Sequence, residues 1–109
     1  MTRIPISAAA AALLRALIGR SGVPRNRILL TDARSVDWRS LTFAGERHEI
    51  HLRVTGPDSG AAAKRLCAGL EDAEFNILGV IVADISAVFS LGNAESVEIV
   101  IEALTVAED

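Results

Sequence analysis

The stretch that most constrains the fold is residues 38–54, WRSLTFAGERHEIHLRV. Over residues 47–55 apolar and polar side chains alternate strictly, which predicts a strand with one buried face. The apolar positions are Ile50, Leu52 and Val54, and the polar positions are Arg47, Glu49, His51, Arg53 and Thr55. We predict two strands joined by a tight turn at residues 44–46, where Gly45 would supply the positive φ of a short hairpin connection. The outer face of this hairpin then carries mixed charge, as expected of an exposed sheet surface or an interface.

The rest of the sequence adds two helices and further strands. A helix is predicted over residues 7–18, with Ser7 as its N-cap, because the leucines of this segment fall on one helical face. A break at residues 56–60, GPDSG, precedes a second helix over residues 61–70, which Asp58 or Ser59 can cap. Further strands are predicted over residues 27–32, 77–89 and 96–106. The most apolar of these strands, over residues 77–89, would be central in the sheet and covered on both faces. The order α-β-β-β-α-β-β predicts an α+β fold, with a mainly antiparallel sheet of about five strands and two helices packed on one face.

Length and composition place this chain among small globular proteins. Its 109 residues predict a single domain over residues 1–109, and 50% hydrophobic with 23% charged residues is typical of a folded chain. A net charge of −3 disfavours a dedicated nucleic-acid binder. The single cysteine, Cys67, excludes an internal disulfide and suits a reducing cytoplasm, where we expect it to be a small buried residue. No stretch approaches the length of a membrane span, and the N-terminal apolar run, which Arg15 interrupts, favours a folded helix over a cleaved signal.

The search for chemistry finds few candidate groups. His48 and His51 invite a metal site, but positions three apart on a strand project to opposite faces, so they cannot share one ion without a bulge. Glycine-rich phosphate loops are missing as well, and we expect no metal site. The basic segment at residues 19–27 is either a solvated connection or a contact with an acidic partner. Trp38 is either packed against the sheet or an interface anchor, and a bulge near residues 39–40 would reconcile its parity with that of the residues after it.

The order of these features resembles a known family. The segments that carry the resemblance are the Ala/Leu-rich helix at 8–18, the short strand at 28–31, the hairpin that Asp37-Trp38 introduces, the helix AAAKRLCAGL after Gly60, the strand around 78–82 and the closing strand ending EALT at 102–105. Together they are similar to the small tail-completion, or tail-terminator, proteins of phages with long non-contractile tails and of alphaproteobacterial gene transfer agents. The likeness covers almost the whole chain, and the ordered set is more specific than any one segment.

The resemblance implies a structural role, with no enzymatic activity, no catalytic residues and no cofactor. Such proteins assemble with copies of themselves into a six-fold ring that ends tail-tube polymerisation and meets the head-closure, or connector, protein. DNA passes through the lumen without specific binding, and no membrane is involved. The chain would reside in the cytoplasm during assembly and then at the head–tail junction of a phage-like particle. We expect the interface with neighbouring subunits or the tube to include Trp38, Arg39, Glu46, Arg47, Glu49 and Arg53.

Two other function classes stay open at this point. One is a small ferredoxin-like module for ligand binding or regulation, which would show a defined apolar pocket with convergent polar groups. The other is a small enzyme, which would need titratable groups with perturbed pKa values gathered in a cleft.

Overall fold

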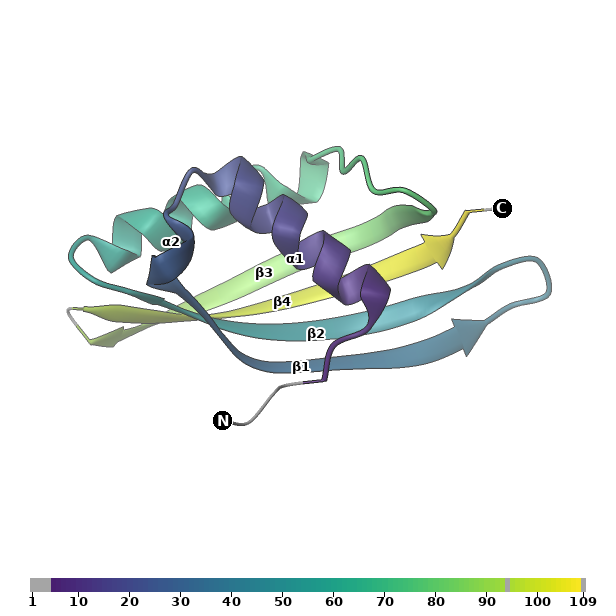
Figure 1. Ribbon diagram of the computed structural model, residues 1–109, viewed down its shortest axis with the longest axis horizontal. Helices are drawn as coiled ribbons and strands as arrows, with labels where there is room; N and C mark the ends of the chain where they lie inside the picture. The colour runs from purple at the N-terminus through teal and green to yellow at the C-terminus, as the bar shows by residue number, and fades with distance from the viewer. Residues whose placement is uncertain (1–4, 94, 109) are drawn as a thin grey trace.

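The computed structural model describes residues 5–93 and 95–108 and shows an α+β fold, with two helices on one face of a four-stranded antiparallel sheet (Figure 1). The helices are α1 (Ala8–Ser21) and α2 (Ser59–Cys67), and the strands are β1 (Ile28–Arg39), β2 (Ala44–Thr55), β3 (Val80–Asn93) and β4 (Ser96–Ala107). The strands lie in the order β1-β2-β4-β3, and each is antiparallel to its neighbour. The predicted class is confirmed, although the described sheet has four strands rather than five.

Helix α1 begins as its sequence predicts but ends three residues later, at Ser21 rather than Ile18. The Oγ of Ser7 accepts a hydrogen bond from the backbone N–H of Ala10 at 3.2 Å, which satisfies one of the unpaired donors of the first turn. Gly22 ends the helix in the left-handed region, with φ of 72°, where a residue without Cβ is favoured. Leu13 and Leu17 are fully buried, so the predicted apolar face is the one that packs on the sheet.

Helix α2 is shorter than predicted and is capped differently. It begins after Asp58, whose φ is 60° and whose side chain makes no capping hydrogen bond to the described residues. The carbonyl of Asp58 instead accepts from the N–H of Ala62 at 3.0 Å. The helix ends at Cys67, and its buried face includes Ala63 and Leu66, as the sequence predicts.

The core lies between the helices and one face of the sheet. Alternate residues of β2 and β4 supply the sheet side of this core, which confirms the predicted alternation over residues 47–55. The buried residues of these two strands are His48, Ile50, Leu52, Val54, Val97, Ile99, Ile101, Ala103 and Thr105. The residues between them face away from the helices.

Strand β1 differs from its prediction in three respects. It runs through residues 28–39 as one strand, so the two predicted pieces are continuous. The extra residue of its bulge is Thr31, between Leu30 and Asp32, rather than near residues 39–40. The hairpin turn lies at residues 40–43, where the N–H of Ser40 donates to the carbonyl of Phe43 at 2.8 Å, so the predicted turn at 44–46 is wrong.

Gly45 lies inside β2 and has a role other than the predicted positive φ. A Cβ built on it would lie 1.9 Å from the backbone carbonyl oxygen of Thr105 on β4 and 3.0 Å from Nε1 of Trp38. Since real side chains do not approach that closely, only glycine fits where these strands meet. The glycine is required for close approach of two backbones, not for a turn.

Strand β3 is an outer strand, so the prediction that it is central and covered on both faces is wrong. Val88 on this strand is 72% exposed. Strand β3 extends to Asn93, four residues beyond the predicted strand, and Ala94 lies outside the described residues. The closing strand is confirmed, since β4 spans Ser96–Ala107. Within the described ranges, neither helix has the length and apolar character needed to cross a membrane.

Candidate interaction surface

The sheet face opposite the helices, which we call the open face, is the main candidate for a functional surface. Residues paired directly across neighbouring strands point to the same face, so the register defines its members. They are Leu29, Asp32, Arg34, Val36 and Trp38 on β1, Gly45, Arg47, Glu49, His51 and Arg53 on β2, Glu98, Val100, Glu102, Leu104 and Val106 on β4, and Ile81, Asp84, Ser86, Val88 and Ser90 on β3. Charged side chains therefore dominate the two middle strands of this face.

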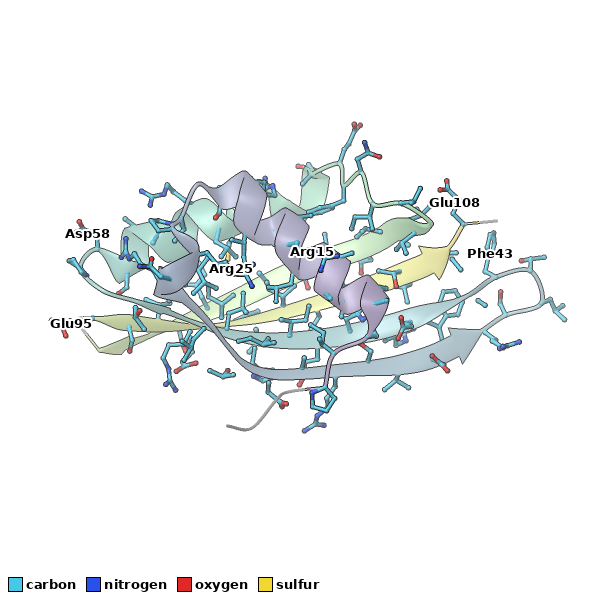
Figure 2. The ribbon with its side chains drawn as sticks, in the orientation of Figure 1. Arg15, Arg25, Phe43, Asp58, Glu95 and Glu108 are labelled. Atoms are coloured by element: carbon cyan, nitrogen blue, oxygen red, sulfur yellow. The ribbon has the colours of Figure 1, made fainter. Side chains whose placement is uncertain are left out.

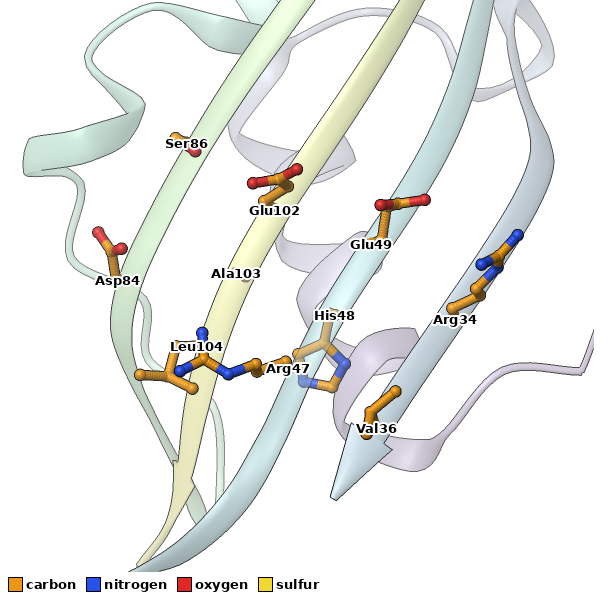
Figure 3. A pocket seen from close by; sticks show the side chains of 10 residues that line it. All are labelled: Arg34, Val36, Arg47, His48, Glu49, Asp84, Ser86, Glu102, Ala103 and Leu104. Atoms are coloured by element: carbon orange, nitrogen blue, oxygen red, sulfur yellow. The ribbon is translucent and has the colours of Figure 1, made fainter. Parts of the chain in front are cut away.

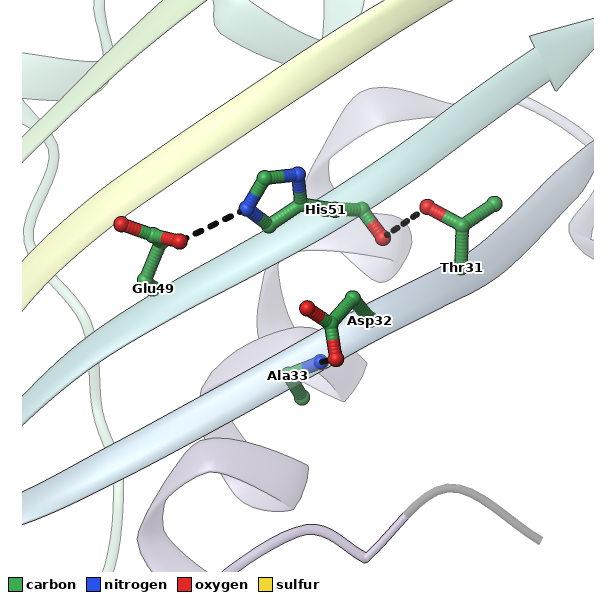
Figure 4. A network of polar contacts seen from close by, with 5 residues as sticks. All are labelled: Thr31, Asp32, Ala33, Glu49 and His51. Carbon is green, nitrogen blue, oxygen red and sulfur yellow. Dashed lines mark hydrogen bonds and ion pairs between the residues drawn. The ribbon is translucent and has the colours of Figure 1, made fainter.

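Two ion pairs link charges on the open face. Nε of Arg53 lies 2.7 Å from a carboxylate oxygen of Glu98 across the β2–β4 pair, and Nε2 of His51 lies 2.8 Å from Oε2 of Glu49 (Figure 4). All four side chains are partly solvated, so each pair stabilises the fold by at most about 1 kcal/mol. These pairs order the surface rather than hold the fold together.

A shallow hollow of about 350 Å³ lies on the open face (Figure 3). Arg34, Arg47, Glu49, Asp84 and Glu102 reach it from all four strands. Glu49 and Glu102 are directly opposite each other on β2 and β4, and like charges in such a pair are destabilising. The hollow is therefore polar and open, and its lining of mixed charge suits contact with another charged surface.

The structure places four of the six predicted interface residues on the open face and separates the other two. Arg47, Glu49 and Arg53 lie in line on β2, as the alternation predicts, and Trp38 lies on the same face opposite Gly45. Glu46 has the opposite parity and pairs with Thr105 on the helix-covered face. Arg39 lies at the end of β1 beside the hairpin turn.

Trp38 takes the packing role of the two considered from the sequence, and the role as interface anchor stays a prediction. It pairs with Gly45, and its side chain is half-buried, so it packs against the sheet. Its indole Nε1 is buried and finds no hydrogen-bond acceptor among the described residues. A buried donor without an acceptor costs about 1–3 kcal/mol, so this end of the sheet is not optimised for stability alone.

Sequence reasoning missed the apolar residues at the two outer strands of the open face. Leu29 and Val36 on β1 are 51% and 63% exposed, and Ile81 on β3 is 50% exposed. The β1 bulge at Leu30/Asp32 and the β3 bulge at Val82/Asp84 each shift the alternation by one residue, so periodicity alone assigns part of each strand to the wrong face. Thr31 marks the β1 bulge, because its Oγ1 donates to the carbonyl of His51 at 3.2 Å (Figure 4).

The helix-covered face holds a chain of hydrogen bonds around His48. Ser7 Oγ donates to Ser35 Oγ at 3.2 Å, and Ser35 Oγ lies 2.7 Å from His48 Nδ1. His48 Nε2 lies 2.8 Å from Thr105 Oγ1, which donates to the carbonyl of Glu46 at 3.4 Å. Because Thr105 Oγ1 gives its one proton to Glu46, it accepts from His48 at Nε2, and a neutral His48 then accepts the Ser35 proton at Nδ1.

The surroundings of His48 favour that neutral form. Its side chain is only 3% exposed, and burial lowers the pKa of His48 from its ordinary value of 6.5, against the opposing charge of Glu46. The chain of hydrogen bonds ties the first turn of α1 to three strands. Because His48 is enclosed, it does not present a base to an external substrate in this conformation.

The remaining candidate groups are structural in this fold. His48 and His51 project to opposite faces, as predicted, and within residues 5–93 and 95–108 no group of three or more potential metal ligands lies together. Burial raises the pKa of the half-buried Cys67 thiol, against the opposing effect of Arg20. In the basic segment, Arg20 donates to the carbonyl of Ala68 at 2.9 Å and Arg27 donates to that of Thr55 at 2.9 Å. These two arginines therefore tie loops together.

Comparison with known proteins adds no relative to this account. No protein-family model matches the sequence, and no curated protein and no solved structure matches the chain. The resemblance to tail-completion proteins is therefore still a prediction from the sequence, and the fold and the open face carry the functional argument.

Proposed function

We propose that this chain is a structural assembly protein, a tail-completion or tail-terminator subunit whose copies form a ring at the head-proximal end of a phage-like tail. The observation that carries the proposal is the open face, which both helices leave uncovered and which carries exposed apolar side chains on its two outer strands. Exposed apolar side chains rimmed by polar ones are typical of protein interaction sites. Since such a surface is suited to binding another protein, it supports an assembly role.

The charge of the open face fits the lumen of such a ring. Its cationic residues are Arg34, Arg47 and Arg53, and its carboxylates are Asp32, Glu49, Asp84, Glu98 and Glu102. Carboxylates outnumber arginines, so the face repels a polyanion on balance. In the proposed ring this face lines the lumen and the helices lie outside, so that DNA passes without specific binding.

The β1–β2 hairpin is the proposed contact with the tail tube. It extends beyond the helices, and Phe43 lies near its end, at the opposite end of the molecule from Asp58 (Figures 1 and 2). Phe43 is 57% exposed, and Leu41 in the same turn is fully exposed. Apolar side chains at the end of a projecting hairpin suit insertion between partner surfaces, and the nearby Arg39 adds charge. We expect charge reversal at Arg39 together with Arg47 to impair assembly.

Electron microscopy of particles from a strain that lacks the gene tests this proposal. We expect tails that are absent, detached or of uncontrolled length beside normal DNA-filled heads, with normal particles restored by the gene in trans. The same strain complemented with the Arg39→Glu/Arg47→Glu variant serves as the interface test. Normal particles in the deletion strain would refute the tail role.

A ligand-binding module is the second candidate, because the hollow on the open face approaches the volume of a small-molecule site. Its lining carries both cations and carboxylates, as Figure 3 shows for Arg34, Glu49 and Glu102, so it would select a small zwitterionic ligand. Thermal-shift measurements with amino acids and short peptides test this alternative. A saturable rise in melting temperature that Glu102→Gln removes would favour the module over the tail protein.

A further inference from the structure

The exposed apolar residues of the open face lie on its two outer strands. Leu29 and Val36 belong to β1, and Ile81 and Val88 belong to β3, with exposed fractions of 51%, 63%, 50% and 72%. The other large hydrophobic residues that are highly exposed lie in turns, at Leu41, Phe43 and Leu78. An uncovered sheet edge can pair with a strand of another chain, and β1 and β3 are the two edges of this sheet.

The two edges match in spacing. Leu29 and Val36 are seven residues apart, and so are Ile81 and Val88. Residues seven apart in a regular strand point to opposite faces, but each of these spans contains one bulge, at Leu30/Asp32 in β1 and at Val82/Asp84 in β3. Each pair therefore returns to the same face, three side-chain rows apart.

The two edges also match in direction. All neighbouring strands are antiparallel in the order β1-β2-β4-β3, so β1 and β3 run in opposite directions. When a second copy is placed beside the first in the same orientation, β3 of one lies antiparallel to β1 of the next. The joined sheet continues the same alternation, and the same contact repeats at every seam.

We propose that copies of this chain pair β1 with β3 of the next copy in one register, with Leu29 opposite Val88, Arg34 opposite Asp84 and Val36 opposite Ile81. In this register both apolar pairs form at the same time. Arg34 and Asp84, which lie between the apolar pairs, also face each other. The fourth pair, Asp32 with Ser86, places a hydroxyl donor opposite a carboxylate. Cross-strand apolar and opposite-charge pairs of this kind stabilise antiparallel sheets.

The same register extends the core on the helix-covered face. It places Ile28 opposite Phe89 and Leu30 opposite Ala87 on that face. All four are partly buried hydrophobic residues that already pack against the core of their own copy. Pairing them across the seam would remove the remaining apolar surface from water on both sides of the sheet.

A repeated contact between different edges is heterologous, and it closes into a ring when the rotation allows. Six copies would supply 24 strands, and this register shifts the pairing by two residues at each seam. At about 4.8 Å spacing that shift gives a strand tilt of about 20° and a barrel on the order of 40 Å across at the backbone. Its lumen would be on the order of 25–30 Å wide after side chains are added. This step rests on the proposed function, whereas the edge register stands on the strand geometry.

Disulfide trapping tests the register directly. In a Cys67→Ser background, Val36→Cys with Ile81→Cys places two thiols at opposite edges of one copy, roughly 14 Å apart across three strand spacings, so that only a neighbouring copy can complete the bond. We expect a ladder of covalent oligomers under mild oxidation. Leu29→Cys with Ile81→Cys is the matched control, because it sets the thiols three rows out of register, and Val36→Cys alone controls for β1–β1 pairing.

Charge exchange tests the same register without cysteines. In R34E two carboxylates face each other at every seam, and in D84R two arginines do, so we expect each variant to associate about fivefold more weakly than wild type. Mixing the two variants restores an opposite-charge pair at both kinds of seam, and sedimentation velocity should show association recover. Recovery in the mixture is the result that a merely destabilised fold cannot produce.

The outcomes separate this inference from the proposed function. Four results would each overturn the register. With cysteines, they are no ladder from the matched pair, an equal ladder from the out-of-register control, or dimers from Val36→Cys alone. With the charge variants, it is no recovery of association on mixing. If the matched cysteines give a ladder but deletion of the gene leaves normal particles, the seam is supported and the tail role is refuted. If deletion removes the tails but the matched cysteines give no ladder, the tail role is supported and the seam is refuted.

Discussion

The hydrogen-bond chain around His48 predicts that the fold loses stability as pH falls. The folded chain holds His48 neutral and buried, with a lowered pKa, whereas the unfolded chain protonates it with a pKa near 6.5. Below pH 6.5 the unfolded state therefore binds a proton that the folded state does not. The free energy of unfolding should be constant near pH 8 and fall as pH drops through 6.5 toward the folded pKa.

The magnitude follows from linkage. One group of this kind changes the free energy of unfolding by at most about 1.4 kcal/mol per pH unit, so the loss at pH 5.5 relative to pH 8 is at most about 1.4 kcal/mol. Protonation also puts a second donor at Nδ1, where the Ser35 hydroxyl now donates, so that hydroxyl must turn away. Most carboxylates titrate below this window, so the effect is separable from general acid denaturation.

Urea titrations followed by the fluorescence of Trp38, at several pH values from 8 to 5.5, measure this loss. His48→Gln should be about 1–3 kcal/mol less stable at pH 8, because Ser35 and Thr105 lose a well-placed partner, but its stability should no longer fall with pH. His51→Gln is the matched control and should keep the wild-type fall. A flat profile in wild type, or an unchanged fall in His48→Gln, would refute the assignment of a neutral buried His48.

Three further predictions concern packing, capping and the open face. Gly45→Ala should cost about 1–3 kcal/mol or abolish folding in thermal melts, because its Cβ would meet the carbonyl of Thr105 on β4. Gly19→Ala should be neutral or stabilising, because no described atom lies within 4 Å of its Cβ outside the backbone of its own helix. Ser7→Ala should lower the free energy of unfolding by about 0.5–2 kcal/mol, and Ser7→Asp should recover most of it if the loss is a capping effect. A double-mutant cycle on Arg53 and Glu98 should give a coupling free energy below about 1 kcal/mol, and added salt should weaken it, because the pair is a solvated surface contact. A larger coupling that salt does not change would contradict this.

Local patterns in the sequence predict the parts of the fold that depend on one segment. The cap at Ser7 and the alternation through Ile50, Leu52 and Val54 both follow from neighbours in the chain, and both are confirmed. The separation of His48 from His51 follows from the two-residue period of a strand, and the structure shows it. The α+β class follows from the order of such segments.

The sequence could not predict features that arise between segments. Gly45 looks like a turn glycine by itself, and only the carbonyl of Thr105, sixty residues away, reveals why it must be glycine. The periodicity of the sequence does not reveal the β1 bulge. It therefore predicts two strands where the structure has one, and it does not identify the exposed apolar residues of β1. Apolar residues on both faces of β3 indicated a central strand, whereas in the described sheet they mark an uncovered edge.

The central claim is that copies of this chain close into a ring at the end of a tail. Cryo-electron microscopy of the head–tail junction in particles that contain the chain tests it most directly. The account predicts a six-fold ring whose density fits this fold, with the open face toward the lumen, the helices outside and β1 of each copy beside β3 of the next. A particle that lacks the chain, or a ring with the helices lining the lumen, would contradict it.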